Sequence, residues 1–83
     1  MLAEEVAKKI LAKLYRHGYI GERHTAIDNV PKGFPKHLHG EDKKTTKNLI
    51  KKGFIIAKPT RYGLQVSLNP RKKAEIERII HTS

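Results

Sequence analysis

The sequence contains no cysteine. This absence excludes a disulfide framework, a thiolate metal site and thiol redox chemistry. No apolar run approaches the roughly 18 residues that a membrane span requires. Charged residues begin at Glu4, so the N-terminus lacks the long apolar block of a secretory signal. We therefore expect a cytoplasmic protein that does not enter a membrane.

The usual sites of enzymatic chemistry are also missing. The eight acidic residues fall mostly at expected helix ends or in surface pairs. The sequence has neither a nucleophile elbow nor a glycine-rich phosphate loop. A chain of 83 residues also has little room for a substrate pocket of ordinary size. We expect no enzymatic activity and no cofactor.

Five histidines raise the question of a metal site. His37 and His39 are two residues apart, and His24 lies thirteen residues before His37. Without cysteine, and without an acidic residue among them, this spacing is weak for zinc. We expect loop hydrogen bonds or phosphate contacts from these histidines, and no metal.

Basic residues are abundant and unevenly placed. Eighteen Lys and Arg residues oppose eight acids, and the formal net charge is +10. Residues 29–61 hold nine basic and two acidic residues, a net charge of +7. A concentrated basic block predicts a polyanionic partner such as DNA, RNA or an anionic membrane surface. The alternative is a solvated surface in a protein rich in Lys and Glu, which fits mixed charge better than a block of one sign.

The segment 40–52 has the periodicity of an amphipathic helix. At about 100° per residue, one arc holds Thr45, Thr46, Leu49 and Ile50, which we expect to face the core. The opposite arc holds Lys43, Lys44, Lys47, Asn48 and Lys51. Acidic residues occupy the first turn and basic residues the last, as the helix dipole favours. Gly53 then supplies a left-handed stop.

The remaining pattern predicts an α+β fold, mostly α, in a single domain over residues 1–83. Apolar spacing of three and four predicts a helix over 2–17. Asn69 as N-cap and Pro70 at the first position predict a final helix over 70–81. Between them we expect a short strand at 24–27, a short irregular helix at 29–36, and strands at 54–58 and 64–68. Phe34 and Leu38 are the expected core anchors of the irregular segment.

The two later strands should form a hairpin around the turn Pro59–Gly63. Alternation in the second strand directs Leu64, Val66 and Leu68 to the core. The same alternation directs Gln65 and Ser67 outward.

This order of elements, with Leu49-Ile50-Lys51-Lys52-Gly53-Phe54-Ile55 at the junction of helix and strand, resembles the winged helix-turn-helix superfamily. The resemblance covers residues 3–68. It implies that helix 40–52 is a recognition helix and that the hairpin is a wing. The segment 30–36 is richer in Pro and Gly than the usual second helix of that superfamily.

The outer arc of helix 40–52 is the main candidate interface. Its lysines suit phosphate neutralisation, which gives affinity without sequence information. Asn48 could read an adenine edge. Because the helix carries no arginine, it suits backbone binding better than sharp base readout. The alternative is a solvated lysine face.

Flanking residues extend this candidate site. Lys58, Arg61 and Tyr62 lie at the expected wing. Arg61 could enter a narrow minor groove, and Tyr62 could either stack on a base or pack across the hairpin. Lys32 and Lys36 extend the basic block, where phosphate contact and simple solvation are equally open.

Three functions remain open at this stage. The first is a small DNA-binding protein, such as a transcriptional regulator, that forms symmetric dimers through its first or last helix. The second is an RNA-binding or ribosome-associated winged-helix protein. The third is a protein–protein interaction module with an acidic partner. A membrane-surface role is weakest, because the apolar arc of helix 40–52 is needed for the core.

Overall fold

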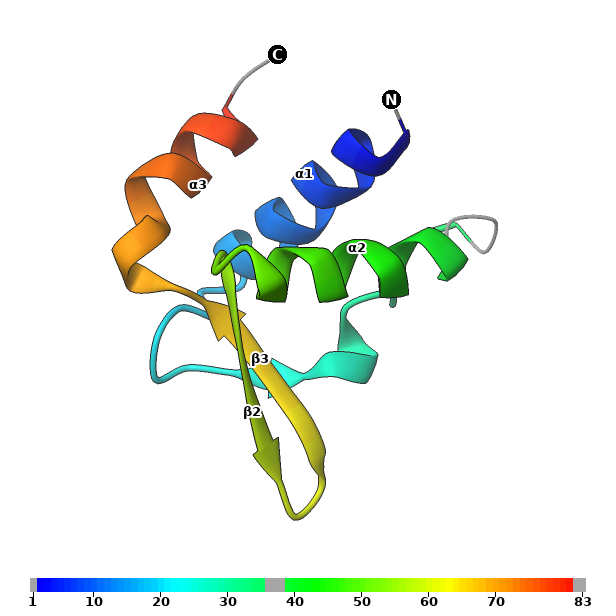
Figure 1. Ribbon diagram of the computed structural model, residues 1–83, viewed down its shortest axis with the longest axis vertical. Helices are drawn as coiled ribbons and strands as arrows, with labels where there is room; N and C mark the ends of the chain where they lie inside the picture. Colours follow the sequence, from blue (N-terminus) through cyan, green and yellow to red (C-terminus); the bar gives the residue numbers. More distant parts are fainter. Residues whose placement is uncertain (1, 36–38, 82–83) are drawn as a thin grey trace.

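The computed structural model describes residues 2–35 and 39–81. This part of the chain is an α+β fold with three α-helices and a three-stranded antiparallel sheet (Figure 1). The elements in chain order are α1 (Leu2–Arg16), β1 (Thr25–Ala26), the 3₁₀ helix η1 (Ile27–Asn29), α2 (His39–Lys51), β2 (Ile55–Thr60), β3 (Gly63–Leu68), the 3₁₀ helix η3 (Pro70–Lys72) and α3 (Lys73–Ile80). The predicted α+β class is confirmed.

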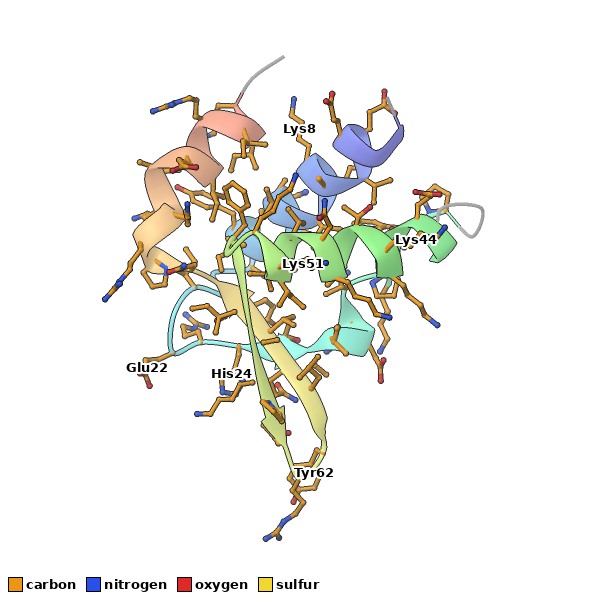
Figure 2. All side chains as sticks on the ribbon, viewed as in Figure 1. Lys8, Glu22, His24, Lys44, Lys51 and Tyr62 are labelled. Atoms are coloured by element: carbon orange, nitrogen blue, oxygen red, sulfur yellow. The ribbon has the colours of Figure 1, made fainter. Side chains whose placement is uncertain are left out.

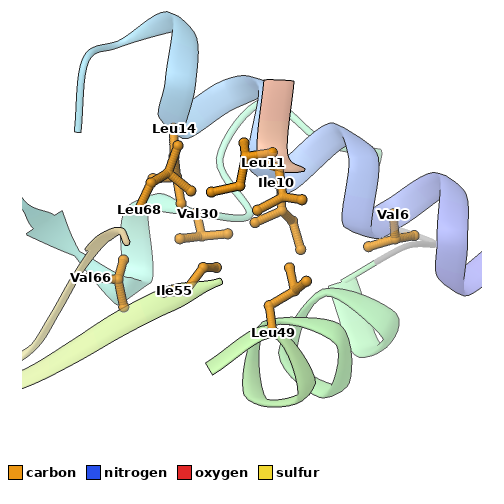
Figure 3. Packing of buried hydrophobic residues seen from close by; sticks show 10 residues of the cluster. Val6, Ile10, Leu11, Leu14, Val30, Leu49, Ile55, Val66 and Leu68 are labelled. Atoms are coloured by element: carbon orange, nitrogen blue, oxygen red, sulfur yellow. The ribbon is translucent and has the colours of Figure 1, made fainter. Parts of the chain in front are cut away.

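One hydrophobic core joins the helices to one face of the sheet (Figure 3). Its buried members are Val6, Ile10, Leu11, Leu14, Val30, Leu49, Ile55, Val66, Leu68 and Ile76. α1 supplies four of them, since apolar residues spaced by three and four lie on one side of a helix. The core thus fixes which faces of α1 and α2 turn inward and which remain available to a partner.

Both long helices end at a glycine with positive φ. Gly18 has φ 74° and Gly53 has φ 85°. After α2, the N–H of Gly53 donates to the carbonyl of Ile50 (3.1 Å) and the N–H of Phe54 to that of Leu49 (3.0 Å). These are the two bonds of a Schellman motif. This closed end leads α2 directly into β2.

The sheet has the order β1-β3-β2, and both pairings are antiparallel. β2 and β3 pair from Ile55↔Leu68 to Thr60↔Gly63. The hairpin loop is therefore Arg61-Tyr62, shorter than the predicted turn over residues 59–63. β2 is an edge strand, so it accommodates Pro59 without loss of a central ladder bond. The longer ribbon projects away from the helices (Figure 1).

The predicted helix at 29–36 is wrong within the described residues. The chain forms η1 at Ile27–Asn29, and a turn follows in which the N–H of Phe34 donates to the carbonyl of Pro31 (3.0 Å). Gly33 has φ 90°, which fits the third position of a type II turn. Phe34 packs partly buried against the core as expected, whereas Lys36 and Leu38 lie outside the described residues.

Lys13 of α1 stabilises the non-helical path of this segment. Its ammonium donates to the carbonyls of Asn29 (2.6 Å), Val30 (3.1 Å) and Lys32. The same Nζ lies 5.4 Å from the centroid of the Phe34 ring, within the range of a cation–π contact. A single side chain therefore satisfies carbonyls that a helix would have used internally.

The expected outward position of Ser67 is also wrong, since this residue is only 3% exposed. Ser67 does lie on the sheet face opposite the core residue Val66. However, the loop before β1 covers it there, and its hydroxyl donates to the carbonyl of Gly21 (3.0 Å). The apolar/polar alternation of the strand correctly predicted the sheet face on which Ser67 lies. It could not show that a loop distant in sequence covers that face.

The C-terminal helix begins as predicted at the Asn69 cap, although in two parts. The Asn69 side chain accepts from the N–H of Arg71 (3.0 Å), and η3 precedes α3. Its Nδ2 also donates to the carbonyl of Gly53 (2.8 Å). Asn69 thus ties the end of α2 to the start of the last helix.

Candidate nucleic-acid interface

α2 is divided cleanly into a buried face and an exposed face. The buried side chains are Asp42, Thr45, Thr46 and Leu49, with Ile50 partly buried. The five residues predicted for the outer arc are all exposed, and we call them the α2 stripe: Lys43, Lys44, Lys47, Asn48 and Lys51. The core contacts of the helix therefore leave every member of the stripe accessible.

Within the described part of the chain, the lysines of the α2 stripe form no ion pair with a carboxylate. Among the described residues, none of their ammonium groups lies within 4.0 Å of a carboxylate. Asp42 is on the same helix, but it is 1% exposed and faces inward. From Lys43 to Lys51 the stripe extends about 12 Å along the helix axis. This length corresponds to about three or four phosphates of one DNA strand.

Tyr62 stands at the tip of the hairpin and is 87% exposed (Figure 2). This exposure rules out the alternative in which its ring packs across the hairpin. Arg61 beside it is also exposed. The turn is closed by Thr60, whose hydroxyl donates to the carbonyl of Gly63 (2.6 Å) and accepts from the N–H of Tyr62 (3.2 Å). The two tip side chains thus project from a defined turn.

Lys58 does not belong to the tip. It pairs with Gln65 inside the ribbon, on the sheet face opposite the core. There it lines a recess of about 400 Å³ together with Glu22 and His24. His24 Nδ1 and Gln65 Oε1 are hydrogen-bonded at 3.1 Å. Lys58 therefore belongs to the outer face of the sheet, apart from Arg61 and Tyr62.

Of the two remaining flanking lysines, only Lys32 is within the described residues, and it lines a different recess from the stripe lysines. Lys32 is exposed at the second position of the 31–34 turn, and it lines a groove against α1. Lys36 falls outside the described residues. The expected continuous basic block over residues 29–61 is thus distributed over more than one surface.

Asp28 is a functional neighbour that the sequence pattern did not reveal. It is exposed in η1 and borders a recess of about 230 Å³ at the N-terminal end of α2, together with Lys43 and Lys47. Its negative charge lowers the positive potential at this end of the stripe. Helical periodicity could not reveal it, because the pairing of η1 with α2 depends on tertiary packing.

Metal and membrane sites find no support in the described part of the chain. Within it, no group of three or more His, Cys, Asp or Glu side chains has the arrangement of a metal site. His37 is outside that part. None of the helices within residues 2–35 and 39–81 combines the length and apolar content needed to cross a bilayer.

Comparisons of the chain with protein-family models, curated proteins and solved structures found no significant match.

Proposed function

We propose that this protein binds nucleic acid through the α2 stripe and the Arg61-Tyr62 tip, with duplex DNA as the preferred partner. The observation that carries the proposal is the clean division of α2. Its inner face is occupied by core contacts, and its outer face presents four lysines without a carboxylate within 4.0 Å in the described structure. Such a surface gains affinity mainly by neutralising phosphates and releasing counterions.

The arrangement of elements supports a winged helix-turn-helix assignment. β1 pairs with β3 at one edge of the sheet, β2 and β3 form a projecting hairpin, and α2 leads directly into β2. In a winged helix, α2 would lie in the major groove and the hairpin would contact the neighbouring backbone. In this protein η1 and the following turn stand in place of the second helix.

Binding should be weakly specific in sequence. The stripe contains lysines and one asparagine but no arginine, and Arg–guanine pairs are the commonest specific contact. Asn48 is the residue on α2 suited to reading an adenine edge. We therefore expect phosphate contacts to position the protein and Asn48 to add a modest preference.

RNA is the second candidate, and the exposed Tyr62 ring favours it. An aromatic side chain at a projecting tip can stack on an unpaired base.

The expected dimer through α1 or α3 finds less support. Among the described side chains, the large apolar ones that are exposed are Ile56 and Tyr62, and neither lies on those helices.

The test is a fluorescence anisotropy titration with a duplex DNA and a structured RNA of equal length, at two salt concentrations. For DNA we expect a slope of about −4 in log affinity against log salt, because four lysines displace counterions. Tighter RNA binding would favour the second candidate. No binding to either at low salt would reject nucleic-acid binding and leave a protein partner.

The matched variants change charge equally on two helices. Lys47→Glu/Lys51→Glu should weaken duplex binding by about a hundredfold, since two phosphate contacts become repulsive. Arg71→Glu/Lys73→Glu makes the same change at exposed positions of η3 and α3 and should have a much smaller effect. Equal losses in both variants would mean that net charge, and not the α2 stripe, determines affinity.

A further inference from the structure

A second basic surface lies on α1, away from the α2 stripe. α1 and the turn after η1 enclose an open groove of about 860 Å³. Five of its lining residues are Lys or Arg, and one is acidic: Lys8, Lys9, Lys13, Arg16, Lys32 and Glu5. We call this surface the α1 groove. Its lining also includes the apolar residues Ala12, Phe34 and Pro35.

Three of these cations are available to a ligand. Lys9, Arg16 and Lys32 are exposed. In the described structure none of the three has a carboxylate within 4.0 Å. Lys9 and Arg16 lie about 10 Å apart along the helix axis. This row is similar in length to the α2 stripe.

Lys13 holds the opposite wall of the groove in place. Its bonds to the carbonyls of Asn29, Val30 and Lys32 fix the turn that carries the Lys32 side chain. Burial lowers the pKa of Lys13, and the nearby Lys32 charge lowers it further, while Asp42 acts in the opposite direction. The charges of Lys13 and Lys32 therefore repel each other, and a bound anion would relieve that repulsion.

The α1 groove and the α2 stripe face in different directions. α1 and α2 pack through their apolar sides, with Leu49 of α2 close to Ile10 of α1 (Figure 3). Their polar sides consequently point away from each other, and Lys8 on α1 points away from α2 in Figure 2. Two packed helices, each about 10 Å across, form a layer about 20 Å thick. A short duplex is stiff, so a duplex that lies along the α2 stripe does not bend around to the Lys9–Arg16 row on the other side of α1.

We propose that the α1 groove is a second binding surface for a duplex phosphate backbone, and that one copy of the protein bridges two duplexes. This inference rests on the proposed function, because the α2 stripe holds the first duplex. Lys9, Arg16 and Lys32 contact phosphates of the second duplex. Lys13 acts through the turn and is a positioning residue.

The test is capture of one duplex by another. A duplex is fixed on beads and saturated with the protein, and a fluorescent duplex of about 20 base pairs is then added at low salt. The wild-type protein should retain the fluorescent duplex. Lys9→Glu/Arg16→Glu should reduce capture about tenfold or more and lower single-duplex affinity no more than about threefold, because α2 remains intact. Arg71→Glu/Lys73→Glu is the control with the same change in charge.

Circular dichroism and the thermal midpoint verify that each variant is folded. Light scattering of the free protein should give a monomer, so that capture cannot arise from two copies joined to each other. Absence of capture by the wild-type protein would overturn the bridging proposal, as would equal capture by Lys9→Glu/Arg16→Glu. Binding of polyglutamate in the groove without duplex capture would also overturn it, in favour of an acidic protein partner.

The two proposals can fail separately. If Lys47→Glu/Lys51→Glu retains full single-duplex affinity, the α2 stripe is not the first site. If that variant loses affinity while the α1 variant retains capture, the proposed function stands and the bridging inference fails.

Discussion

α2 and the segment 27–35 lie next to each other and acquire their structure in different ways. α2 makes its own backbone hydrogen bonds, ends at Gly53, and faces the core with a side that its periodicity defines. The segment 27–35 holds one 3₁₀ helix and one turn, and its carbonyls bind an ammonium from another helix. The comparison shows that local signals suffice to specify α2, whereas its neighbour also depends on a long-range side-chain contact.

Of the changes that test this comparison, removal of the core contact of α2 should lower the free energy of unfolding most. Leu49 is 5% exposed, and Leu49→Ala should lower the free energy of unfolding by about 3 kcal/mol through lost burial and a cavity. Urea denaturation measures the change. Ile56→Ala, at a residue 42% exposed on the other sheet face, should cost much less. Similar losses in the two variants would show that α2 does not depend on its buried face.

Lys13→Met should affect the segment 27–35 selectively. It removes the donor to three carbonyls, and we expect a loss of about 2 kcal/mol in the free energy of unfolding. Amide exchange should accelerate at Val30 and Phe34, whose N–H groups close η1 and the following turn, while α2 amides change little. Lys9→Met on the exposed side of α1 is the matched control. Equal acceleration throughout α2 would mean that the two regions are not independent.

Asp28→Asn should produce the smallest of these effects, and it tests the contact between η1 and α2. The carboxylate borders the recess shared with Lys43 and Lys47, so its neutralisation should raise duplex affinity about twofold at low salt, and less at high salt. Anisotropy titration measures this gain. Glu22→Gln removes an equal charge on the other face of the sheet and should leave affinity unchanged. A gain of the same size from Glu22→Gln would indicate a general charge effect.

The structure of α2 was predictable from the sequence, whereas that of the segment 27–35 was not, and the difference has a physical reason. The segment 40–52 was predicted and His39–Lys51 is observed, because side-chain periodicity, dipole-compatible charges and a terminal glycine are all local signals. The inward and outward sides of α2 also agree with the arcs drawn from the sequence. The helix expected at 29–36 is absent because Gly33 and Pro35 disfavour it locally. The path that replaces it has carbonyls bound by Lys13, which lies 16 to 19 residues earlier in the chain.

Other differences also follow from contacts between distant residues. Ser67 is covered by the loop before β1 and donates a hydrogen bond to the carbonyl of Gly21, 46 residues away. Lys58 and Lys32 were grouped with the α2 stripe by their position in the sequence, but strand pairing and the turn after η1 place them on other surfaces. Net charge per segment therefore predicted a polyanion partner without predicting how many surfaces present that charge.

The sequence alone determined the regular helices, their buried sides and the glycine at which α2 ends, because each depends on residues within a few positions of one another. Tertiary structure decided the path of residues 27–35 and the surfaces on which Lys32 and Lys58 lie. Those features depend on which distant groups are available to satisfy a carbonyl or to cover a face, and a linear pattern does not contain that information.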